Sequence, residues 1–230
     1  MRINDDLSKT VLVNAAELDW VPSPAAGVDR RMLFRIGKER ARATSIVRYA
    51  PGSAFPRHTH GGGEEFVVLD GVFQDEHGDY PAGSYIRNPP GTSHVPASES
   101  GCTIFVRLWQ FRESDRTQIA IRPGEGRDVA TRPGSESARV LFDDGAEEVR
   151  IETWSAGTTV RVENERGIEF IVLTGSLTVD GTALGAQSWG RLPGGVPFNA
   201  EISEDGTTVW MKQGALIHPD VCDIGESDPR

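Results

Sequence analysis

The sequence predicts an all-β protein made of two copies of one domain, each an antiparallel sandwich or barrel. Short runs rich in β-branched and aromatic residues recur along the 230 residues, and glycine, proline, aspartate and asparagine separate them. Helical periodicity is scarce, and three blocks of the first half reappear in the same order in the second half. Many short strands at close spacing are typical of sandwiches and barrels, and an internal repeat indicates two similar domains.

The expected elements are short and separated by turns. A helical turn is expected at residues 14–18, where Asn14 is placed to cap it. Turn signals such as Asp70-Gly71 and Pro89-Pro90-Gly91 end the strands. Residues 112–136 are polar and are predicted to form a connector with one strand at 117–121. The other expected strands are residues 31–36, 43–49, 65–69, 84–87, 102–111, 138–142 and 148–154.

The repeat sets the predicted domain organisation. Three matched blocks in one order are hard to attribute to chance. We therefore predict an N-terminal domain over residues 1–114 and a degenerate C-terminal copy over residues 115–230. The matched pairs are residues 65–71 with 169–175, 82–91 with 186–195, and 101–107 with 206–212.

Four residues of the first half suggest a metal site. His58 and His60 are one residue apart, so their side chains share one face if this segment is extended. The glycines at positions 61–63 can turn the chain sharply, which lets the next strand bring Glu64 back to the same place. A third histidine, His94, follows in the segment Asn-Pro-Pro-Gly-Thr-Ser-His. Imidazole and carboxylate groups are suitable ligands for divalent transition metals.

The repeat provides an internal comparison for this site. Glu64 corresponds to Ile168, and His94 corresponds to Phe198. The scaffold residues persist while the histidines are lost, so we infer that folding does not need the histidines. We expect one metal ion per chain and none in the second copy.

His58 and His60 can be aligned with the second copy in two ways. They correspond to Val162 and Asn164, or to Glu163 and Glu165 if a one-residue gap is allowed. The second alignment leaves open a carboxylate metal site in the second copy, made by Glu163, Glu165 and Glu169.

The spacing of these residues resembles the two motifs of the cupin superfamily. Motif one is glycine, five residues, His-x-His, three or four residues, glutamate, six residues and glycine. Motif two is glycine, five residues, Pro-x-Gly, two residues, histidine, three residues and asparagine. Ser98 stands at the asparagine position, which is not a ligand in the family. The other positions are filled by Gly52, His58, His60, Glu64, Gly71, Gly83, Pro89, Gly91 and His94.

The resemblance implies two tandem cupin barrels, which are double-stranded β-helices or jelly rolls. It also implies a metal bound in the first barrel by His58, His60, Glu64 and His94. Within the cupins, residues 49–66, 71–85 and 87–94 resemble the cupin domain of ChrR-type anti-sigma factors, whose metal is zinc. Those proteins hold the sigma factor through a separate helical domain with a His/Cys zinc site. This chain begins almost directly with the cupin and has no Cys-x-x-Cys, so sigma-factor binding is not expected.

The ligand set leaves the identity of the metal open. Three imidazoles and one carboxylate suit zinc, Fe(II), manganese, nickel or copper. On tetrahedral zinc the four ligands would close the site and make it structural. On an octahedral ion they would leave two positions for a substrate or O₂. We expect one divalent ion per chain, with zinc as the first choice and Fe(II), Mn or Ni as alternatives.

Composition excludes several classes of partner. The net charge of −10 gives no electrostatic reason to bind nucleic acid or an acidic membrane. No apolar run of roughly 18 residues is present, and the N-terminus lacks a signal core, so we expect a cytoplasmic protein. Cys102 is expected to be a buried structural thiol. A small-molecule ligand is expected, and a homodimer formed through sheet edges is left open.

Other barrel residues carry simpler expectations. Phe66 and Val68 share the face of Glu64 and should form an apolar wall inside the barrel. Arg57 and Glu65 should point outward. The remaining histidines, His77 and His218, are expected to be solvated.

Three functions are compatible with these features. The first is a metal-binding, ChrR-like protein that binds or senses a small molecule. The second is a non-haem metal-dependent dioxygenase or related oxidoreductase acting on a small oxygenated substrate. The third is a metal-assisted isomerase, for which Tyr49, Tyr80 or Tyr85 would supply an acid or base.

Overall fold

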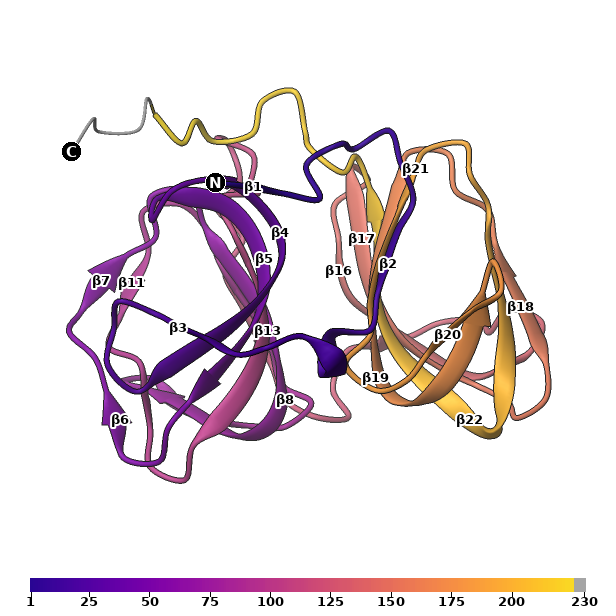
Figure 1. Ribbon diagram of the computed structural model, residues 1–230, viewed down its shortest axis with the longest axis horizontal. Helices are drawn as coiled ribbons and strands as arrows, with labels where there is room; N and C mark the ends of the chain where they lie inside the picture. Colours follow the sequence, from indigo (N-terminus) through magenta and orange to yellow (C-terminus); the bar gives the residue numbers. More distant parts are fainter. Residues whose placement is uncertain (226–230) are drawn as a thin grey trace. The chain divides into compact units, whose positions relative to one another are not determined.

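The computed structural model describes residues 1–225, and these are all-β apart from the 3-10 turn η1 (Ala15–Glu17) (Figure 1). Contacts divide the chain into two compact units. Among the described residues, unit 1 contains residues 1–5, 19–125 and 217–225, and unit 2 contains residues 6–18 and 126–216. The predicted all-β class is therefore confirmed.

Unit 1 is an antiparallel barrel built on the strand order β1-β4-β5-β13-β8-β10-β14. A separate two-stranded sheet pairs β7 with β11. The strands are β1 (Arg2–Ile3), β3 (Val21–Pro22), β4 (Val28–Gly37), β5 (Ala41–Tyr49), β6 (Ser53–Ala54), β7 (His58–Thr59), β8 (Glu64–Asp75), β9 (Gly78–Pro81), β10 (Tyr85–Asn88), β11 (Ser93–His94), β12 (Ala97–Ser98), β13 (Cys102–Leu108) and β14 (Ile119–Ile121).

Unit 2 repeats this arrangement with the strand order β15-β16-β17-β22-β19-β21-β2. Its interior is a continuous apolar cluster that includes Trp154, Phe170 and Phe198. The strands are β2 (Val11–Val13), β15 (Arg127–Asp128), β16 (Ser135–Asp143), β17 (Glu147–Trp154), β18 (Thr159–Val162), β19 (Gly167–Val179), β20 (Thr182–Leu184), β21 (Trp189–Pro193) and β22 (Phe198–Gly214).

The units differ from the predicted ranges 1–114 and 115–230 at three segments. Strand β14 lies in unit 1 because it pairs with β10, with Ile121 opposite Tyr85. Strand β2 lies in unit 2 because it pairs with β21, with Val13 opposite Trp189. The segment that follows residue 216 returns to unit 1, where the Cys222 N–H donates to the Phe111 carbonyl. In each case a segment that the sequence order assigns to one domain pairs with, or bonds to, the other domain. Strands β2 and β14 thereby cover exposed sheet edges.

The predicted strands are present, with shifted ends. The run at 65–69 extends into the long strand β8, whereas the run at 102–111 ends at Leu108. Trp109 has a positive φ of 59°, a conformation that cannot continue a strand. The predicted turn at 14–18 is present as η1, but the Asn14 amide donates to the Glu17 carboxylate at 2.7 Å instead of capping the backbone.

One glycine of each copy is explained by close backbone approach. Gly71 and Gly175 are equivalent in the repeat and have φ values of +71° and +75°. A Cβ added at either position would overlap a carbonyl oxygen, that of Gly101 in unit 1 and that of Gly206 in unit 2. The final glycine of the first motif is therefore needed for the fold, because it allows a long strand to bend past its neighbour.

Gly175→Ala is expected to destabilise unit 2 more than Gly181→Ala, measured by chemical denaturation. Both glycines have φ near +75°, but a Cβ at Gly181 meets nothing within 4 Å. The Gly181 variant should lose about 1–2 kcal/mol of unfolding free energy from the left-handed backbone alone. The Gly175 variant should lose at least twice as much, because the overlap adds to the same strain. Equal losses would contradict this explanation.

No helix within residues 1–225 has the length and hydropathy needed to cross a membrane.

Candidate metal centre

The four predicted ligands come together in unit 1. Strands β7 and β11 pair so that His94 lies opposite His58, and Glu64 begins strand β8. One donor atom from each of His58, His60, Glu64 and His94 lies within 4.8 Å of the others. The cluster could therefore bind one metal ion.

The triple glycine has a packing role as well as a conformational one. Only Gly63 of the three has a positive φ, of +80°. A Cβ at Gly61 or Gly62 would overlap the indole ring of Trp109, and one at Gly63 would overlap Phe111. The segment between His60 and Glu64 is therefore held close to these aromatic rings, which positions both ligands.

The three imidazole rings are arranged around a common point. Their centroids are 4.7–5.0 Å apart, and each pair of ring planes meets at 79–81°. The Nε2 atoms of His60 and His94 lie 3.5 Å and 3.6 Å from Oε1 of Glu64. Three mutually perpendicular rings beside one carboxylate oxygen suit convergence on a single ion.

A hydrogen-bond chain sets the orientation of His60. The Thr92 hydroxyl donates to the Pro89 carbonyl at 2.7 Å, so its oxygen is available to accept from Nδ1–H of His60 at 3.0 Å. The proton on Nδ1 leaves the Nε2 lone pair directed at the cluster. Outer hydrogen bonds of this kind orient metal-ligating histidines and make them more basic.

Asp75 has a similar position behind His94. Its Oδ2 lies 3.4 Å from Nδ1 of His94, while Nε2 of the same ring faces Glu64. Burial lowers the pKa of His94, but the contact with Asp75 and the charge of Glu64 outweigh it and leave the pKa raised. Burial raises the pKa of Asp75, but bonds from His94 and the His77 backbone outweigh it and leave this pKa lowered.

The electrostatics of the other ligands favour uncharged groups when no cation is bound. Burial, assisted by the neighbouring imidazoles, lowers the pKa of His60 to about 3. Burial and the charge of His94 lower the pKa of His58. Burial raises the pKa of Glu64. Neutral imidazoles are the form that binds metals, and a cation would stabilise the buried carboxylate.

Two atoms that face the centre of the cluster are buried without a hydrogen-bond partner among the described residues. These are Nε2 of His60 and Oε1 of Glu64; on the other side of its ring, Nδ1 of His94 has only the 3.4 Å contact with Asp75. Leaving such atoms unpaired costs about 1–3 kcal/mol each. Both are donor atoms that converge on the centre of the cluster, so the residues fit a divalent metal ion.

Thr92→Val is expected to weaken metal affinity about 10- to 100-fold, which is the usual effect of losing an outer hydrogen bond to a ligand. Without the hydroxyl, the His60 ring loses its orienting partner. Titration of the metal-free protein with Zn²⁺ against a competing chelator would measure the change. Thr92→Ser keeps the hydroxyl and should restore most of the affinity. Unchanged affinity in the valine variant would contradict this role.

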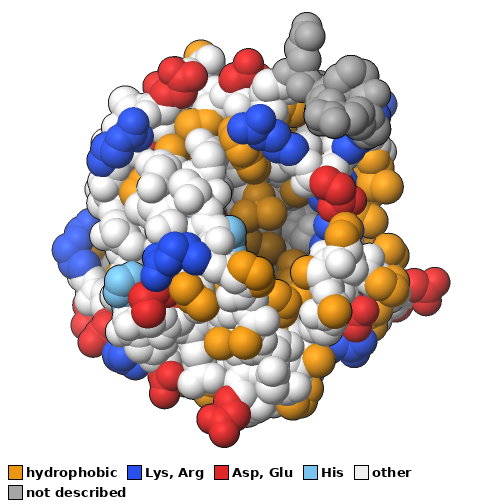
Figure 2. Space-filling model, turned by 90° about the vertical axis from the view of Figure 1, so that its left-hand side faces the viewer, with side chains coloured by type: hydrophobic (Ala, Val, Ile, Leu, Met, Phe, Trp, Pro, Cys, Tyr) orange, Lys and Arg blue, Asp and Glu red, His pale blue; other side chains and the backbone are white. Residues whose placement is uncertain are grey.

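A cavity of about 400 Å³ opens onto the cluster in unit 1. His58 and Glu64 form part of its wall, and most of the remaining wall is apolar. Figure 2 shows a hollow of this kind, with hydrophobic side chains inside it and charged and histidine side chains near its edge. The volume is suitable for a small organic molecule.

Unit 2 has apolar side chains at three of the four equivalent positions, and the fourth, that of His60, is held by Asn164, whose amide donates to the Pro193 and Val196 carbonyls. Phe198 lies opposite Val162 in β22 and β18, as His94 lies opposite His58. This strand register agrees with the alignment without a gap, in which His58 corresponds to Val162. Val162, Ile168 and Phe198 all belong to the buried apolar cluster, with no more than 1% of each exposed.

The carboxylate alternative for unit 2 does not assemble. Glu163 is 75% exposed and pairs with Arg161, whereas Glu169 is buried and accepts a bond from Nε1 of Trp189. The only group of three or more metal-ligating side chains found among residues 1–225 is the cluster of unit 1.

Several other expectations are confirmed. Phe66 and Val68 are 1% exposed and belong to the apolar cluster of unit 1. Cys102 is a buried free thiol. Arg57 is 57% exposed and pairs with Glu76 at 2.6 Å. Ser98, at the motif position usually held by asparagine, donates to the Val72 carbonyl.

Two expectations were wrong. Glu65 was expected to lie outside, but it is 1% exposed and bonds Tyr85 and Arg107 from the neighbouring strands. His218 was expected to be solvated but is 7% exposed. Alternation along a strand identifies the face of a side chain, but it does not say whether that face is covered.

Sequence reasoning missed the residues that support the ligands. Thr92 and Asp75 were not singled out, although Thr92 precedes His94 by only two residues. Of the three tyrosines considered as acids or bases, Tyr49 lines the cavity, whereas Tyr85 bonds Glu65. Burial and the charge of Glu64 raise the pKa of Tyr49, so it stays protonated.

Two antiparallel barrels, one of them with a His₃Glu cluster, are the arrangement that the resemblance to the cupins implied. Residues 8–112 belong to the cupin superfamily, because they match the family model described as the ChrR cupin-like domain. No curated protein matches the sequence.

Solved structures of low sequence identity share the fold. A "putative dioxygenase" from Nostoc punctiforme is 15% identical with a TM-score of 0.71, covering 97% of this chain and 88% of that one. Bacterial pirin YhhW from Escherichia coli, in complex with nickel(II), is 16% identical with a TM-score of 0.65, covering 90% of this chain and 100% of that one. An oxalate decarboxylase is 15% identical with a TM-score of 0.59, covering 96% and 81%. The prediction of two tandem cupin barrels is therefore confirmed.

Proposed function

We propose that this protein binds one divalent metal ion in unit 1 and uses it to bind a small oxygenated molecule, as a small-molecule-binding or regulatory (sensor) protein. The observation that carries this proposal is the position of the cluster on the wall of the cavity. His58 and Glu64 line the cavity, while His60 and His94 are buried behind them. A site open on one side can exchange a ligand, whereas a closed structural site cannot.

The four ligand residues have two different roles in the proposed binding. His60 and His94, held from behind by Thr92 and Asp75, provide the rigid side of the site. His58 and Glu64 complete the ligand set at the cavity wall. When bound, a divalent ion supplies Lewis-acid chemistry that draws electron density from an oxygen atom of the ligand. The apolar wall, including Ile104 and Val106, offers no hydrogen-bond partner to water from these side chains and suits the apolar part of a ligand.

Zinc is the first proposal for the metal, and Fe(II), manganese and nickel are the alternatives. The similarity of residues 8–112 to the ChrR cupin-like domain supports zinc. The donor set itself accepts all four ions. The nickel(II) in the similar pirin belongs to that protein and supports only the capacity of the fold to hold a divalent ion.

Elemental analysis of protein purified without added metal tests this proposal. We expect one equivalent of metal per chain, and two equivalents would contradict the assignment of a single site. Absence of any bound metal after addition of zinc, iron, manganese or nickel would overturn the proposed function. Removal of the metal with a chelator should lower the thermal stability of unit 1, since binding to the folded state stabilises it.

A metal-dependent dioxygenase or related oxidoreductase is the second candidate function. It is favoured by the apolar wall beside a metal site open to a ligand, and by the shared fold of the Nostoc punctiforme protein. Oxygen uptake measured with diketones, flavonols and thiols separates the two candidates. Stoichiometric zinc without oxygen uptake would favour binding or sensing, whereas iron or manganese with substrate-dependent uptake would favour the enzyme.

A further inference from the structure

The cavity of unit 1 contains an arginine that the metal site does not use. Arg30, on strand β4, lies opposite Val47 on β5, and both side chains line the cavity. The Arg30 side chain is 17% exposed, and its Nε is buried without a hydrogen-bond partner among the described residues. Its nearest recorded carboxylate is that of Glu39, 3.6 Å from Nη1 and 70% exposed. A pair at this separation whose carboxylate is largely exposed contributes little.

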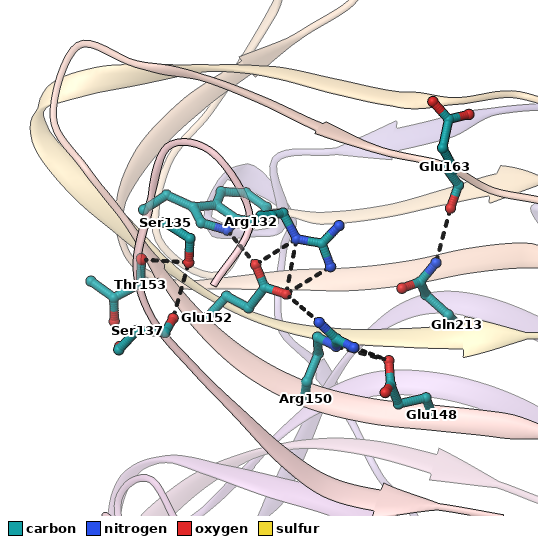
Figure 3. Close-up of polar contacts among 10 residues, drawn as sticks. Arg132, Ser135, Ser137, Glu148, Arg150, Glu152, Thr153, Glu163 and Gln213 are labelled. Carbon is teal, nitrogen blue, oxygen red and sulfur yellow. Dashed lines mark hydrogen bonds and ion pairs between the residues drawn. The ribbon is translucent and has the colours of Figure 1, made fainter. Parts of the chain in front are cut away.

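In unit 2 the equivalent of Val47 is a charged residue with its own partners. Glu152 on β17 lies opposite Val209 as Val47 lies opposite Ile104, so Glu152 is the counterpart of Val47. Glu152 is fully buried and accepts hydrogen bonds from Nε and Nη2 of Arg132 at 2.8–3.1 Å (Figure 3).

The ion pairs of unit 2 continue along strand β17. Arg150 donates from Nη1 to Glu152 at 2.9 Å and from Nε to Glu148 at 2.8 Å (Figure 3). These side chains alternate along β17 and share one face of it. The register places small or apolar residues at the equivalent positions of unit 1, namely Ala43, Ser45 and Val47. Unit 1 therefore lacks the ion-paired side chains that fill the barrel of unit 2, and it retains an arginine.

From this comparison we infer that the cavity of unit 1 binds a small molecule that carries a carboxylate, and that Arg30 pairs with this carboxylate as Arg132 pairs with Glu152 in unit 2. The planar guanidinium can form two parallel bonds to a carboxylate. The apolar wall formed by Val47, Ile104 and Val106 would hold the body of the ligand. The inference deepens the proposed function by naming a ligand class, and it rests on that function only for the metal at the same cavity.

Calorimetric titration of the purified, metal-loaded protein with matched probes tests this inference. The probes are 3-phenylpropanoate and its neutral analogue 3-phenylpropanamide, with benzoate and benzamide as a shorter pair. We expect one acid or both to bind at least about 10-fold more tightly than the amide, since a hydrogen bond to a charged group contributes about 1.5–3 kcal/mol. Equal affinity of acid and amide, or no binding of either acid at millimolar concentration, would overturn the inference.

Variants of Arg30 test whether this residue causes the preference for the acid over the amide. Arg30→Met should reduce the ratio of acid to amide affinity to near one, and Arg30→Lys should give an intermediate ratio. Arg31→Met is the matched control, because it removes the same charge from the next residue, whose guanidinium stacks on Trp20 at 4.2 Å. A specific pairing of Arg30 with the carboxylate would be contradicted if the ratio of acid to amide affinity stayed high in Arg30→Met. It would also be contradicted if the ratio fell equally in Arg31→Met.

A variant of Val47 makes unit 1 imitate unit 2. Val47→Glu places a carboxylate opposite Arg30 and should abolish binding of the acid. Val47→Gln has the same size without the charge and should weaken the acid and the amide alike. Loss of acid preference in the glutamine variant to the same extent as in the glutamate variant would contradict competition by charge.

The metal-free protein separates this inference from the proposed function. If the acid still binds in an Arg30-dependent way without metal, the Arg30 site stands even where the metal proposal fails. If the acid preference disappears with the metal but survives Arg30→Met, the carboxylate binds the metal. That result would overturn the role of Arg30 and leave the metal site intact.

Discussion

Replacing His60 by alanine is expected to reduce the metal content of the purified protein from about one equivalent per chain to a small fraction of one. The substitution removes the Nε2 donor that faces the cluster and lies 3.5 Å from Glu64. Loss of an outer partner of a ligand already costs 10- to 100-fold in affinity, so loss of the ligand itself should cost roughly 100-fold or more. Elemental analysis and titration with Zn²⁺ would measure both changes.

His77→Ala is the matched control for this experiment. His77 is an exposed histidine of unit 1, and its backbone N–H, which the substitution retains, donates to Asp75 at 2.8 Å. This variant should keep one equivalent of metal. A His60→Ala protein with full metal occupancy would contradict the assignment of the site, and circular dichroism of both variants would exclude general misfolding.

Replacing Glu152 by alanine is expected to cost unit 2 about 3–5 kcal/mol of stability, because it leaves two partly buried guanidinium groups without their shared, fully buried carboxylate. The carboxylate accepts bonds from Arg132, Arg150 and Nε1 of Trp154. Urea denaturation followed by tryptophan fluorescence measures the loss. Trp154, Trp189 and Trp210 all belong to unit 2, so this signal reports mainly on that unit.

The control for this variant is Glu163→Ala. Glu163 pairs with Arg161 at the surface of the same unit, with 75% of the Glu163 side chain exposed. An exposed pair of this kind should give no measurable change. The metal content should stay at one equivalent in both variants, because the four ligands lie in unit 1. A loss below about 1 kcal/mol in Glu152→Ala would contradict the role of the buried network.

The stability that Glu152 contributes should also depend on pH. Burial raises its pKa, but bonds from Arg132 and Trp154 outweigh burial and leave the pKa below its ordinary value of 4.5. A carboxylate whose pKa is depressed in the folded state stabilises fully above its unfolded pKa. The difference in stability between wild type and Glu152→Ala should therefore be complete above pH 4.5 and shrink as the pH falls through the lower folded-state value.

The candidate metal ligands were accessible to sequence reasoning because they lie in a local arrangement. His58 lies on strand β7 and His60 directly follows that strand, Glu64 begins β8 after a tight bend, and His94 is supplied by the strand paired with β7. The repeat added independent information, since scaffold residues such as Gly71 and Gly175 persist for a packing reason while the ligands do not.

The features that the sequence did not reveal depend on contacts between distant segments. Strands β2 and β14 complete sheets of the units that their positions in the chain do not suggest. The burial of Glu65 depends on Tyr85 and Arg107, which reach it from two neighbouring strands. Register between strands, rather than any local pattern, determines these contacts.

The sequence alone determined the all-β class, the duplication and the four candidate ligands, because strand alternation and glycine turns act over short distances. Only the tertiary structure decided what occupies each barrel. In unit 2 the Arg132–Glu152–Arg150 network and Phe198 fill the interior, whereas in unit 1 Arg30 faces an open cavity beside His58 and Glu64. The physical reason is that these side chains come from segments far apart in the chain, and only the register of the folded sheets brings them together.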